Sequence, residues 1–156
     1  MACRIIPAEL AWAPCLTAIA IAAKAHWRYP ASWLYAWREE LTLSPNTLRS
    51  MPTYVAVCDE RIVGFYSIRT ASRVASLEHL WVLPIAMGKG IGRMLFQHAM
   101  LLSAENGCRE ILVESDPNAE GFYLRMGARR QGYRESPVQG VTRQLPVLRK
   151  DLPMHV

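Results

Sequence analysis

Three glycines alternate at positions 88, 90 and 92, with the basic residues Lys89 and Arg93 among and after them. The first backbone N–H groups of a helix have no intrahelical partner, and the helix dipole gives that end partial positive charge. Glycine lets the backbone approach an anion closely and adopt a positive φ. A turn of this kind at the start of a helix is therefore typical of a phosphate-binding loop.

The segments on either side of the glycines fit this use. Leu80–Leu83 is an apolar, partly β-branched run that predicts a buried strand, and Pro84 ends the strand because proline has no N–H to donate. After the glycines, apolar residues recur at three- and four-residue steps up to Leu102, which predicts one face of a helix. The alternative, a merely flexible connection, is less favoured because the glycines lie between a strand and a helix.

Two common nucleotide-binding patterns are excluded by the spacing. The dinucleotide fingerprint needs glycine at the first, third and sixth positions of the loop, and the sixth position counted from Gly88 is Arg93. The Walker pattern ends in Gly-Lys-Ser/Thr, a triplet that this sequence lacks. A nucleotide-binding protein that uses this loop is therefore a weaker hypothesis.

The glycine turn resembles the acetyl-CoA signature of the GNAT superfamily of N-acetyltransferases, Gln/Arg-x-x-Gly-x-Gly/Ala. Here it reads Met87-Gly88-Lys89-Gly90-Ile91-Gly92, with methionine in place of Gln or Arg. That loop binds the pyrophosphate mainly through main-chain N–H groups, so the departure at the first position weakens the match without breaking it.

A second segment, residues 116–128, resembles the other signature of the family, Asn-x-x-Ala-x-x-Phe-Tyr-x-Lys/Arg-x-Gly-Phe. Two positions depart from it, since Asp116 stands where the pattern has Asn and Ala128 where it has Phe. The matching positions are Ala119, Phe122, Tyr123, Arg125 and Gly127. Two partial signatures in the right order are more specific than either alone.

The coarse element order predicted from the sequence is β-α-α-β-β-β-α-β-α-β-β, which is the order in the fold of this family. The resemblance therefore implies an α/β (α+β) fold with a mixed, mostly antiparallel central sheet flanked by helices, and a single domain over residues 1–156. The expected strands cover 3–6, 53–58, 61–70, 74–83, 110–114, 129–135 and 143–152. The expected helices cover 8–27, 32–40 and 91–105, with a short turn near 44–51 and a short helix that follows residues 116–118 and ends at Met126.

The resemblance implies an acetyl-CoA-dependent N-acetyltransferase that moves an acetyl group by direct transfer to a primary amine, with a small-molecule amine favoured as acceptor. It implies that Val82 offers main-chain groups to the pantetheine arm and to the thioester oxygen, and that the side chain of Asn118 holds the pantetheine. A helix cap is the alternative role for Asn118. The residues expected to bind acetyl-CoA are Val82, Gly88, Lys89, Gly90, Ile91, Gly92, Arg93, Asn118 and Tyr123.

The chemistry requires a base, because an alkyl amine is mostly protonated at neutral pH, and it benefits from an acid at the leaving thiolate. By resemblance, Tyr123 is the candidate acid and Glu78 the candidate base. Glu114 and Asp116, at the end of the next strand, are further residues that could line the cleft. His79 follows Glu78 and faces the other side of the strand, so it is expected to be structural.

Aromatic residues crowd the segment between Trp27 and Trp37. The first interpretation is ordinary packing at the edge of the core. The second is a wall of the acceptor pocket, because the family uses this region to select its acceptor, and aromatic rings suit an apolar amine or one held by cation–π contact.

The composition is that of a globular protein, with 51% hydrophobic and 20% charged residues and a formal net charge of +5. The basic residues are scattered, which favours a phosphate-bearing small ligand about as well as nucleic acid. No arginine-rich tail or zinc-finger spacing supports nucleic acid, so we expect no such partner. The four cysteines have no metal-ligand spacing. We expect no metal, and reduced, mostly buried thiols in a cytoplasmic protein.

The uncharged stretch from Leu10 to Ala23 imitates a signal peptide, but Glu9 precedes it and Pro14 interrupts it. It is also too short to cross a bilayer, so we expect a buried helix and no membrane association. The alternative function is a CoA-binding sensor or interaction module without turnover. Members of the family often form homodimers, and the resemblance extends that expectation to this chain.

Overall fold

The computed structural model describes residues 2–153, and the chain folds as two compact units. Unit 1 contains the residues up to Ile68 together with Glu78–Ala99, and unit 2 contains Arg69–Leu77 and the residues from Met100 onward. The division passes through two elements, because strand β4 (Val74–Val82) and helix α5 (Ile91–Glu105) contribute residues to both units.

Unit 1 holds the first strands and the short helices. These are β1 (Cys3–Pro7), η1 (Leu10–Trp12), α1 (Ala13–Ala25), α2 (Ala31–Ala36), α3 (Arg38–Leu41), α4 (Pro45–Ser50), β2 (Thr53–Cys58), most of β3 (Arg61–Arg69) and η2 (Pro84–Ala86). Unit 2 holds β5 (Glu110–Glu114), η3 (Pro117–Ala119), α6 (Glu120–Arg125), β6 (Arg129–Val138) and β7 (Val141–Asp151).

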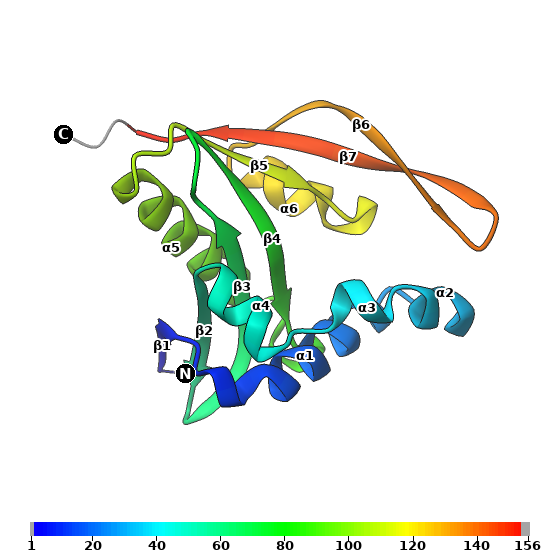
Figure 1. Cartoon of the computed structure of the whole chain (residues 1–156), viewed down its shortest axis with the longest axis horizontal. Coiled ribbons are helices and arrows are strands. Elements are labelled where there is room, and N and C mark those ends of the chain that lie inside the picture. The colour runs from blue at the N-terminus through cyan, green and yellow to red at the C-terminus, as the bar shows by residue number, and fades with distance from the viewer. Residues whose placement is uncertain (1, 154–156) are drawn as a thin grey trace. The chain divides into compact units, whose positions relative to one another are not determined.

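The strands belong to one seven-stranded sheet in the order β1-β2-β3-β4-β5-β7-β6 (Figure 1). The pairs β1–β2, β2–β3, β5–β7 and β6–β7 are antiparallel, and β4–β5 is parallel. This mixed, mostly antiparallel sheet with helices beside it confirms the fold class that was predicted.

Alternation along β3 divides the interior of unit 1 between two faces. The hydroxyl of Tyr66 is hydrogen-bonded to Nδ1 of His98 on α5 at 2.6 Å, so this face is covered by α5. Its neighbour Phe65 points the other way, with its ring centroid 5.9 Å from that of His79. The predicted helix face of α5 is confirmed, since Ile91 and Leu95 are among its buried residues.

The first helices differ from the prediction in their bounds. The helix expected over residues 8–27 consists of the 3₁₀ turn η1 and then α1. Pro14 lies in the first turn of α1, where its missing N–H has no intrahelical acceptor in any case, so it does not interrupt the helix.

The helix expected over residues 32–40 is divided at Trp37 into α2 and α3. Ser32 lies inside α2 and does not cap it, because the N-cap residue is Pro30. By contrast, Ser44 caps α4 through a capping box with Thr47, which confirms the predicted turn there.

The closing hairpin is longer and tighter than predicted. The strands β6 and β7 are joined at Gln139-Gly140, and both residues have a positive φ, 46° and 77°. Two such residues form a turn whose twist matches that of the strands. The segment Ser136-Pro137, expected in a loop, therefore lies in β6, an edge strand that tolerates proline.

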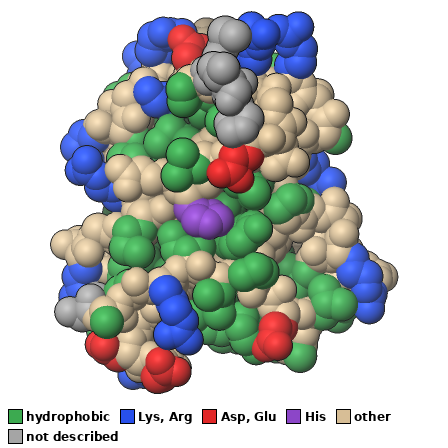
Figure 2. Space-filling model, turned by 90° about the vertical axis from the view of Figure 1, so that its left-hand side faces the viewer, with side chains coloured by type: hydrophobic (Ala, Val, Ile, Leu, Met, Phe, Trp, Pro, Cys, Tyr) green, Lys and Arg blue, Asp and Glu red, His purple; other side chains and the backbone are tan. Residues whose placement is uncertain are grey.

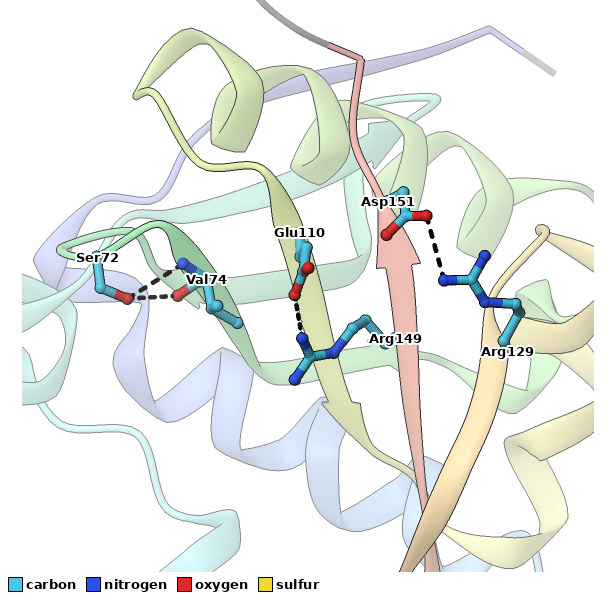
Figure 3. A network of polar contacts seen from close by, with 6 residues as sticks. All are labelled: Ser72, Val74, Glu110, Arg129, Arg149 and Asp151. Atoms are coloured by element: carbon cyan, nitrogen blue, oxygen red, sulfur yellow. Dashed lines mark hydrogen bonds and ion pairs between the residues drawn. The ribbon is translucent and has the colours of Figure 1, made fainter.

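Polar contacts in unit 2 hold its strands in register (Figure 3). Arg149 on β7 forms an ion pair with Glu110 on β5. On the other side of β7, the guanidinium of Arg129 lies 3.2 Å from the Asp151 carboxylate. At the start of β4, the hydroxyl of Ser72 donates to the carbonyl of Val74, two residues later, at 2.8 Å.

The prediction of reduced thiols is wrong for two of the four cysteines. Cys3 on β1 and Cys58 on β2 are register partners and form a disulfide. They come from strand ends 55 positions apart in the sequence, so their spacing carried no signal of the pairing. Cys15 is exposed, and Cys108 alone is a buried thiol as expected.

The surface agrees with the scattered basic residues of the sequence. On the face drawn in Figure 2, the Lys and Arg side chains stand apart from one another among hydrophobic and uncharged ones. Within residues 2–153, no helix is long and apolar enough to cross a membrane. Among the same residues, no group of His, Cys, Asp and Glu side chains is arranged to hold a metal ion.

Candidate functional site

The glycine turn between β4 and α5 has the conformation that its sequence predicts. Gly88 and Gly90 have φ values of 77° and 81°, in the left-handed region that a residue with a Cβ adopts only at a cost. A Cβ at either position would meet nothing within 4 Å. Backbone conformation, rather than crowding, therefore requires glycine at these two positions, and the space beside them is open.

The first turn of α5 continues from this loop. The side chain of Ile91 is buried, so only its main chain can face a ligand. The amide of Met94 donates to the carbonyl of Gly90 at 3.0 Å, which leaves the preceding helical amides as the ones without an intrahelical acceptor. The side chains of Lys89 and Arg93 are exposed beside them. This set of amides and cations fits a pyrophosphate.

The end of β4 offers a further main-chain donor. The amide of Leu83 donates to the carbonyl of Val63 on β3 at 2.8 Å. Because consecutive amides of a strand point to opposite edges, the amide of Val82 points away from β3. An amide that points away from the neighbouring strand can donate to a ligand.

Glu78, the candidate base, also lies in unit 1. Strand alternation places it on the same face of β4 as Val82 and opposite His79 and Trp81. Its side chain is exposed. Unit 1 thus holds Glu78, Val82 and the glycine turn, whereas Asn118 and Tyr123 belong to unit 2.

Asn118 is not the helix cap that was given as the alternative to its role in pantetheine binding. Asp116 is the N-cap residue of η3, and its Oδ1 accepts from the backbone amide of Asn118 at 2.8 Å. The same oxygen accepts from the side-chain Nδ2 of Asn118 at 3.0 Å. Asp116 is therefore the cap, and the amide group that was predicted to hold the pantetheine is engaged with it.

Asp116 also takes part in a buried ion pair that was not predicted from the sequence. Its Oδ2 lies 3.7 Å from Nη2 of Arg143 on β7, and the two side chains are only 7% and 11% exposed. Nothing in the sequence links residues so far apart. Glu114, the other residue proposed to line the cleft, is paired with Arg134 at 2.8 Å. Both carboxylates thus have structural partners.

Tyr123, the candidate acid, is buried on α6 of unit 2. Burial raises the pKa of its phenol well above the usual range, so the hydroxyl keeps its proton at neutral pH. Its ring contacts that of Phe122 edge to face, with centroids 5.0 Å apart. A buried phenol that holds its proton suits a hydrogen-bond donor to a leaving thiolate, and it also packs the helix.

The aromatic segment forms a compact cluster around a lysine. Tyr29, Trp33 and Trp37 are four residues apart, and their ring centroids lie 5.0–5.9 Å from one another. Nζ of Lys24, at the end of α1, lies 4.3 Å from the centroid of Trp37 and 5.2 Å from that of Tyr29. It is also 6.0 Å from that of Trp81 on β4. These distances allow cation–π contacts.

The contacts of Lys24 and Trp81 with this segment were not predicted from the sequence. One signal was available, because Lys24 is the only Asp, Glu, Lys or Arg between Glu9 and Arg28. A lone charge near the end of an apolar helix needs an environment that accepts it. Only the fold shows that the surroundings of Lys24 include the ring of Trp81 from β4.

A hydrogen bond to His79 orients the Trp81 ring. The indole Nε1 donates to Nδ1 of His79 at 3.0 Å. Since an indole N–H can only donate, Nδ1 is unprotonated and the neutral imidazole carries its proton on Nε2. Burial lowers the pKa of His79 to about 4, so this form prevails at neutral pH. The structural role expected of His79 is therefore to hold the ring of Trp81 in place.

Comparisons with known proteins identify the family. The family described as acetyltransferase (GNAT) domain matches residues 50–127, which include the glycine turn and nearly all of the second signature. The chain belongs to the GNAT family. It is therefore an acetyl-CoA-dependent N-acetyltransferase, as the two signatures predicted. A relative is the peptidyl-lysine N-acetyltransferase YjaB of Salmonella typhimurium, 32% identical over 114 residues that cover 72% of this chain and 74% of the relative.

Solved structures share the fold of this GNAT protein. A GCN5-related N-acetyltransferase from Rhodopseudomonas palustris superposes with a TM-score of 0.82 at 19% identity, over 97% of each chain. YncA from Salmonella typhimurium, solved with its cofactor acetyl-CoA, gives a TM-score of 0.71 at 18% identity, over 100% of this chain and 97% of that one. At these identities the likeness establishes the fold.

Proposed function

We propose that this GNAT protein transfers an acetyl group from acetyl-CoA directly to a primary amine, with residues 1–156 acting as one domain. The observation that carries the proposal is the glycine turn, whose left-handed Gly88 and Gly90 lead into the first amides of α5. An open turn of this kind, flanked by Lys89 and Arg93, suits the pyrophosphate of a CoA ester.

The roles proposed for the other residues follow from the chemistry of acyl transfer. The nitrogen lone pair of the amine attacks the thioester carbonyl carbon, the C–S bond breaks, and the CoA thiolate takes up a proton. The amide of Val82 is proposed to stabilise the developing oxyanion, and Tyr123 to protonate the thiolate. Glu78 is proposed to remove a proton from the amine, directly or through water. The side-chain amide of Asn118 is proposed to give up its hydrogen bond to Asp116 and to contact the pantetheine instead.

The acceptor has two candidate classes. A small-molecule amine is the class favoured by the resemblance. A lysine side chain of a protein is the second candidate, and it is supported by the name of the relative YjaB, a peptidyl-lysine N-acetyltransferase. Both are alkyl amines, so the same base and acid serve either one. A homodimeric state and a cytoplasmic location remain predictions that sedimentation and cell fractionation test.

Thermal unfolding with acetyl-CoA, NAD or ATP tests the donor first. A ligand at about 100 times its dissociation constant adds roughly 2.7 kcal/mol to the free energy of unfolding, so the midpoint should rise with acetyl-CoA alone. A rise only with NAD or ATP would refute the proposal.

Release of the CoA thiol is then measured with a panel of polyamines, amino acids and lysine-containing peptides. Amine-dependent release, with the acetylated product seen by mass spectrometry, supports direct transfer and shows which class is preferred. Binding of acetyl-CoA without release for any amine would favour the module without turnover.

A further inference from the structure

Helix α1 is apolar on the side that packs inside unit 1 and also on the opposite side. Its buried residues are Ala13, Leu16, Ile19, Ala20 and Ala23. The exposed and half-buried residues on the opposite side form what we call the α1 outer face, and they are Pro14, Cys15, Ala18, Ile21, Ala22 and Ala25. A helix at a protein surface ordinarily carries charged and polar side chains on its outer side, so the α1 outer face differs from a solvated one.

Large hydrophobic side chains extend this surface along the helix. Ile21 is 42% exposed, and Leu10 and Trp27, which lie before and after α1, are each 37% exposed. The one charge between Glu9 and Arg28, that of Lys24, lies against aromatic rings on another side of the helix. An exposed apolar surface with charges at its rim marks a site of interaction with another molecule.

The charges at the two ends of this surface indicate the partner. Glu9 lies nine residues before Ala18 and Arg28 lies ten residues after it, and both side chains are exposed. At a rise of about 1.5 Å per helical residue, each charge is roughly 15 Å from Ala18 along the helix. If two copies of α1 pack antiparallel and cross at Ala18, Glu9 of each copy comes opposite Arg28 of its partner. The surface is thus complementary to itself, as a two-fold dimer requires.

The residues near the crossing point allow two helices to come close together. Ala18 and Ala22 have short side chains, so the axes of the two helices can lie as near as about 8 Å. Ile21 then packs against the apolar surface of the second helix. An interface centred on one helix from each copy is small among specific interfaces, so we expect a dissociation constant on the order of 10 µM.

We propose that the α1 outer face is the contact of a two-fold homodimer, in which the α1 helices of two copies pack antiparallel about Ala18 and Glu9 of each copy pairs with Arg28 of the other. All of these residues belong to unit 1, so the interface needs one compact unit from each copy. This interface is independent of the proposed acetyl transfer, because none of its residues is given a part in that reaction.

Sedimentation velocity of the full chain, from about 1 to 200 µM, measures the association and should show a reversible equilibrium of monomer and dimer. Ala18→Glu places two like charges against each other at the crossing point, and Ile21→Glu places a charge in the apolar contact. Each should weaken the dimer at least about thirtyfold. Leu101→Glu is the control, because Leu101 is an exposed apolar residue of another helix, α5, and its substitution should leave the dissociation constant unchanged. Circular dichroism checks that each variant is folded.

Exchange of the end charges tests the antiparallel arrangement. Glu9→Arg or Arg28→Glu alone places like charges opposite each other at both ends of the interface and should weaken the dimer about tenfold. The double variant Glu9→Arg with Arg28→Glu restores opposite charges and should return the dissociation constant to within about threefold of the wild type. In a parallel pair like charges meet in all of these proteins, so single variants that associate as the wild type does would overturn the antiparallel arrangement.

Cys15 gives an independent measurement on the same surface. It is exposed in the separate chain and would be covered in the dimer. Its reaction with a thiol reagent should therefore slow as the concentration of the wild type rises, and should stay rapid at every concentration in Ala18→Glu. In a Cys15→Ser background, Ala18→Cys should form a disulfide between two chains on oxidation, because the two copies of residue 18 meet at the two-fold axis.

Two results would overturn the proposed interface. A dimer that Ala18→Glu and Ile21→Glu leave intact would show that the copies associate through another surface. A wild type that stays monomeric up to the highest concentration would exclude a second copy as the partner. Co-sedimentation of that monomer with vesicles of phosphatidylcholine and phosphatidylglycerol, lost in Ile21→Glu, would then assign the α1 outer face to a lipid surface instead.

Discussion

Trp81 and His79 lie two residues apart on one face of β4, and the indole Nε1–H donates to Nδ1 of the imidazole across 3.0 Å. This bond links the protonation of a histidine to the placement of an aromatic ring. Protonation of His79 would place two N–H donors opposite each other, so the bond would be lost. The neutral imidazole is therefore part of the folded state.

The first prediction concerns the pH dependence of stability. The pKa of His79 is lowered by burial from 6.5 to about 4, so the unfolded chain binds more protons between these pH values than the folded one. The free energy of unfolding should therefore fall as pH decreases from about 6.5 to 4, with a contribution from His79 approaching roughly 3 kcal/mol. Urea unfolding at pH 7 and pH 4.5, followed by circular dichroism, measures the loss.

The matched variants are His79→Gln, which should show a smaller loss between the two pH values, and His26→Gln at an exposed position, which should behave as the wild type. Equal losses in the wild type and in His79→Gln would contradict the assignment of a buried neutral imidazole.

A second prediction concerns the close approach at Gly64. A Cβ there would lie 2.8 Å from the carbonyl oxygen of Trp81, a backbone atom that cannot move aside easily, and 3.2 Å from the Leu95 side chain. Gly64→Ala should therefore destabilise the protein by about 1–3 kcal/mol in urea unfolding. Gly132→Ala is the control, because a Cβ at Gly132 would meet nothing within 4 Å. A Gly64→Ala protein as stable as Gly132→Ala would show that this part of β3 and β4 is not so tightly packed.

Local chemistry explains which parts of the fold were predictable. Alternating and helical apolar patterns, together with prolines, placed the strands and the helix α5 to within a few residues. The glycine turn was predictable because its positive φ values demand glycine. The short helices were less predictable, because the helix expected over residues 32–40 is divided at Trp37, where no proline or glycine marks a break in the sequence.

Features that join distant segments were not predictable. The disulfide of Cys3 and Cys58 depends on the register of β1 with β2, which no local pattern specifies. The ion pair of Asp116 and Arg143 likewise depends on where β7 lies. The cluster on Lys24 was predictable only in part. The rings of Tyr29, Trp33 and Trp37 follow one another at four-residue steps in the sequence, but Lys24 on α1 and Trp81 on β4 come from other elements.

A third prediction concerns the thiols. Without reductant, the folded protein should show one thiol that reacts rapidly with a thiol reagent, that of exposed Cys15. Burial raises the pKa of Cys108, so its thiol should react slowly. Cys3 and Cys58 should react only after reduction. If all four cysteines of the unreduced protein reacted with the thiol reagent, whether rapidly or slowly, this would contradict the disulfide.

Reduction should also lower the stability. The disulfide closes a loop of 55 residues, for which the chain-entropy relation gives a stabilisation of about 4 kcal/mol. The double variant Cys3→Ser with Cys58→Ser should lose a similar amount relative to the oxidised wild type. Its unfolding midpoint should then be insensitive to reductant, whereas the midpoint of the wild type should fall when reductant is added.

A fourth prediction concerns the glycine turn. Gly90→Glu places a negative charge and a strained side chain where the CoA pyrophosphate is proposed to bind, so the thermal shift with acetyl-CoA should disappear. Gly140→Glu is the matched control, because Gly140 also has a positive φ, 77°, but lies in the β6–β7 turn. That variant should be destabilised to a similar degree and should keep the acetyl-CoA shift. An undiminished shift in Gly90→Glu would remove the turn from the cofactor site.

The last prediction separates catalysis from binding at Tyr123. Tyr123→Phe removes only the hydroxyl that is proposed to protonate the thiolate, and it keeps the ring that packs α6. We expect kcat to fall about tenfold or more, while the dissociation constant of acetyl-CoA changes little. Tyr133→Phe, at an exposed position on β6, is the control and should retain wild-type turnover. Because a thiolate leaves more readily than an alkoxide, the loss should lie at the lower end of the range for general acids. If Tyr123→Phe retains full turnover, the hydroxyl has no part in the transfer and the tyrosine serves only to pack the helix.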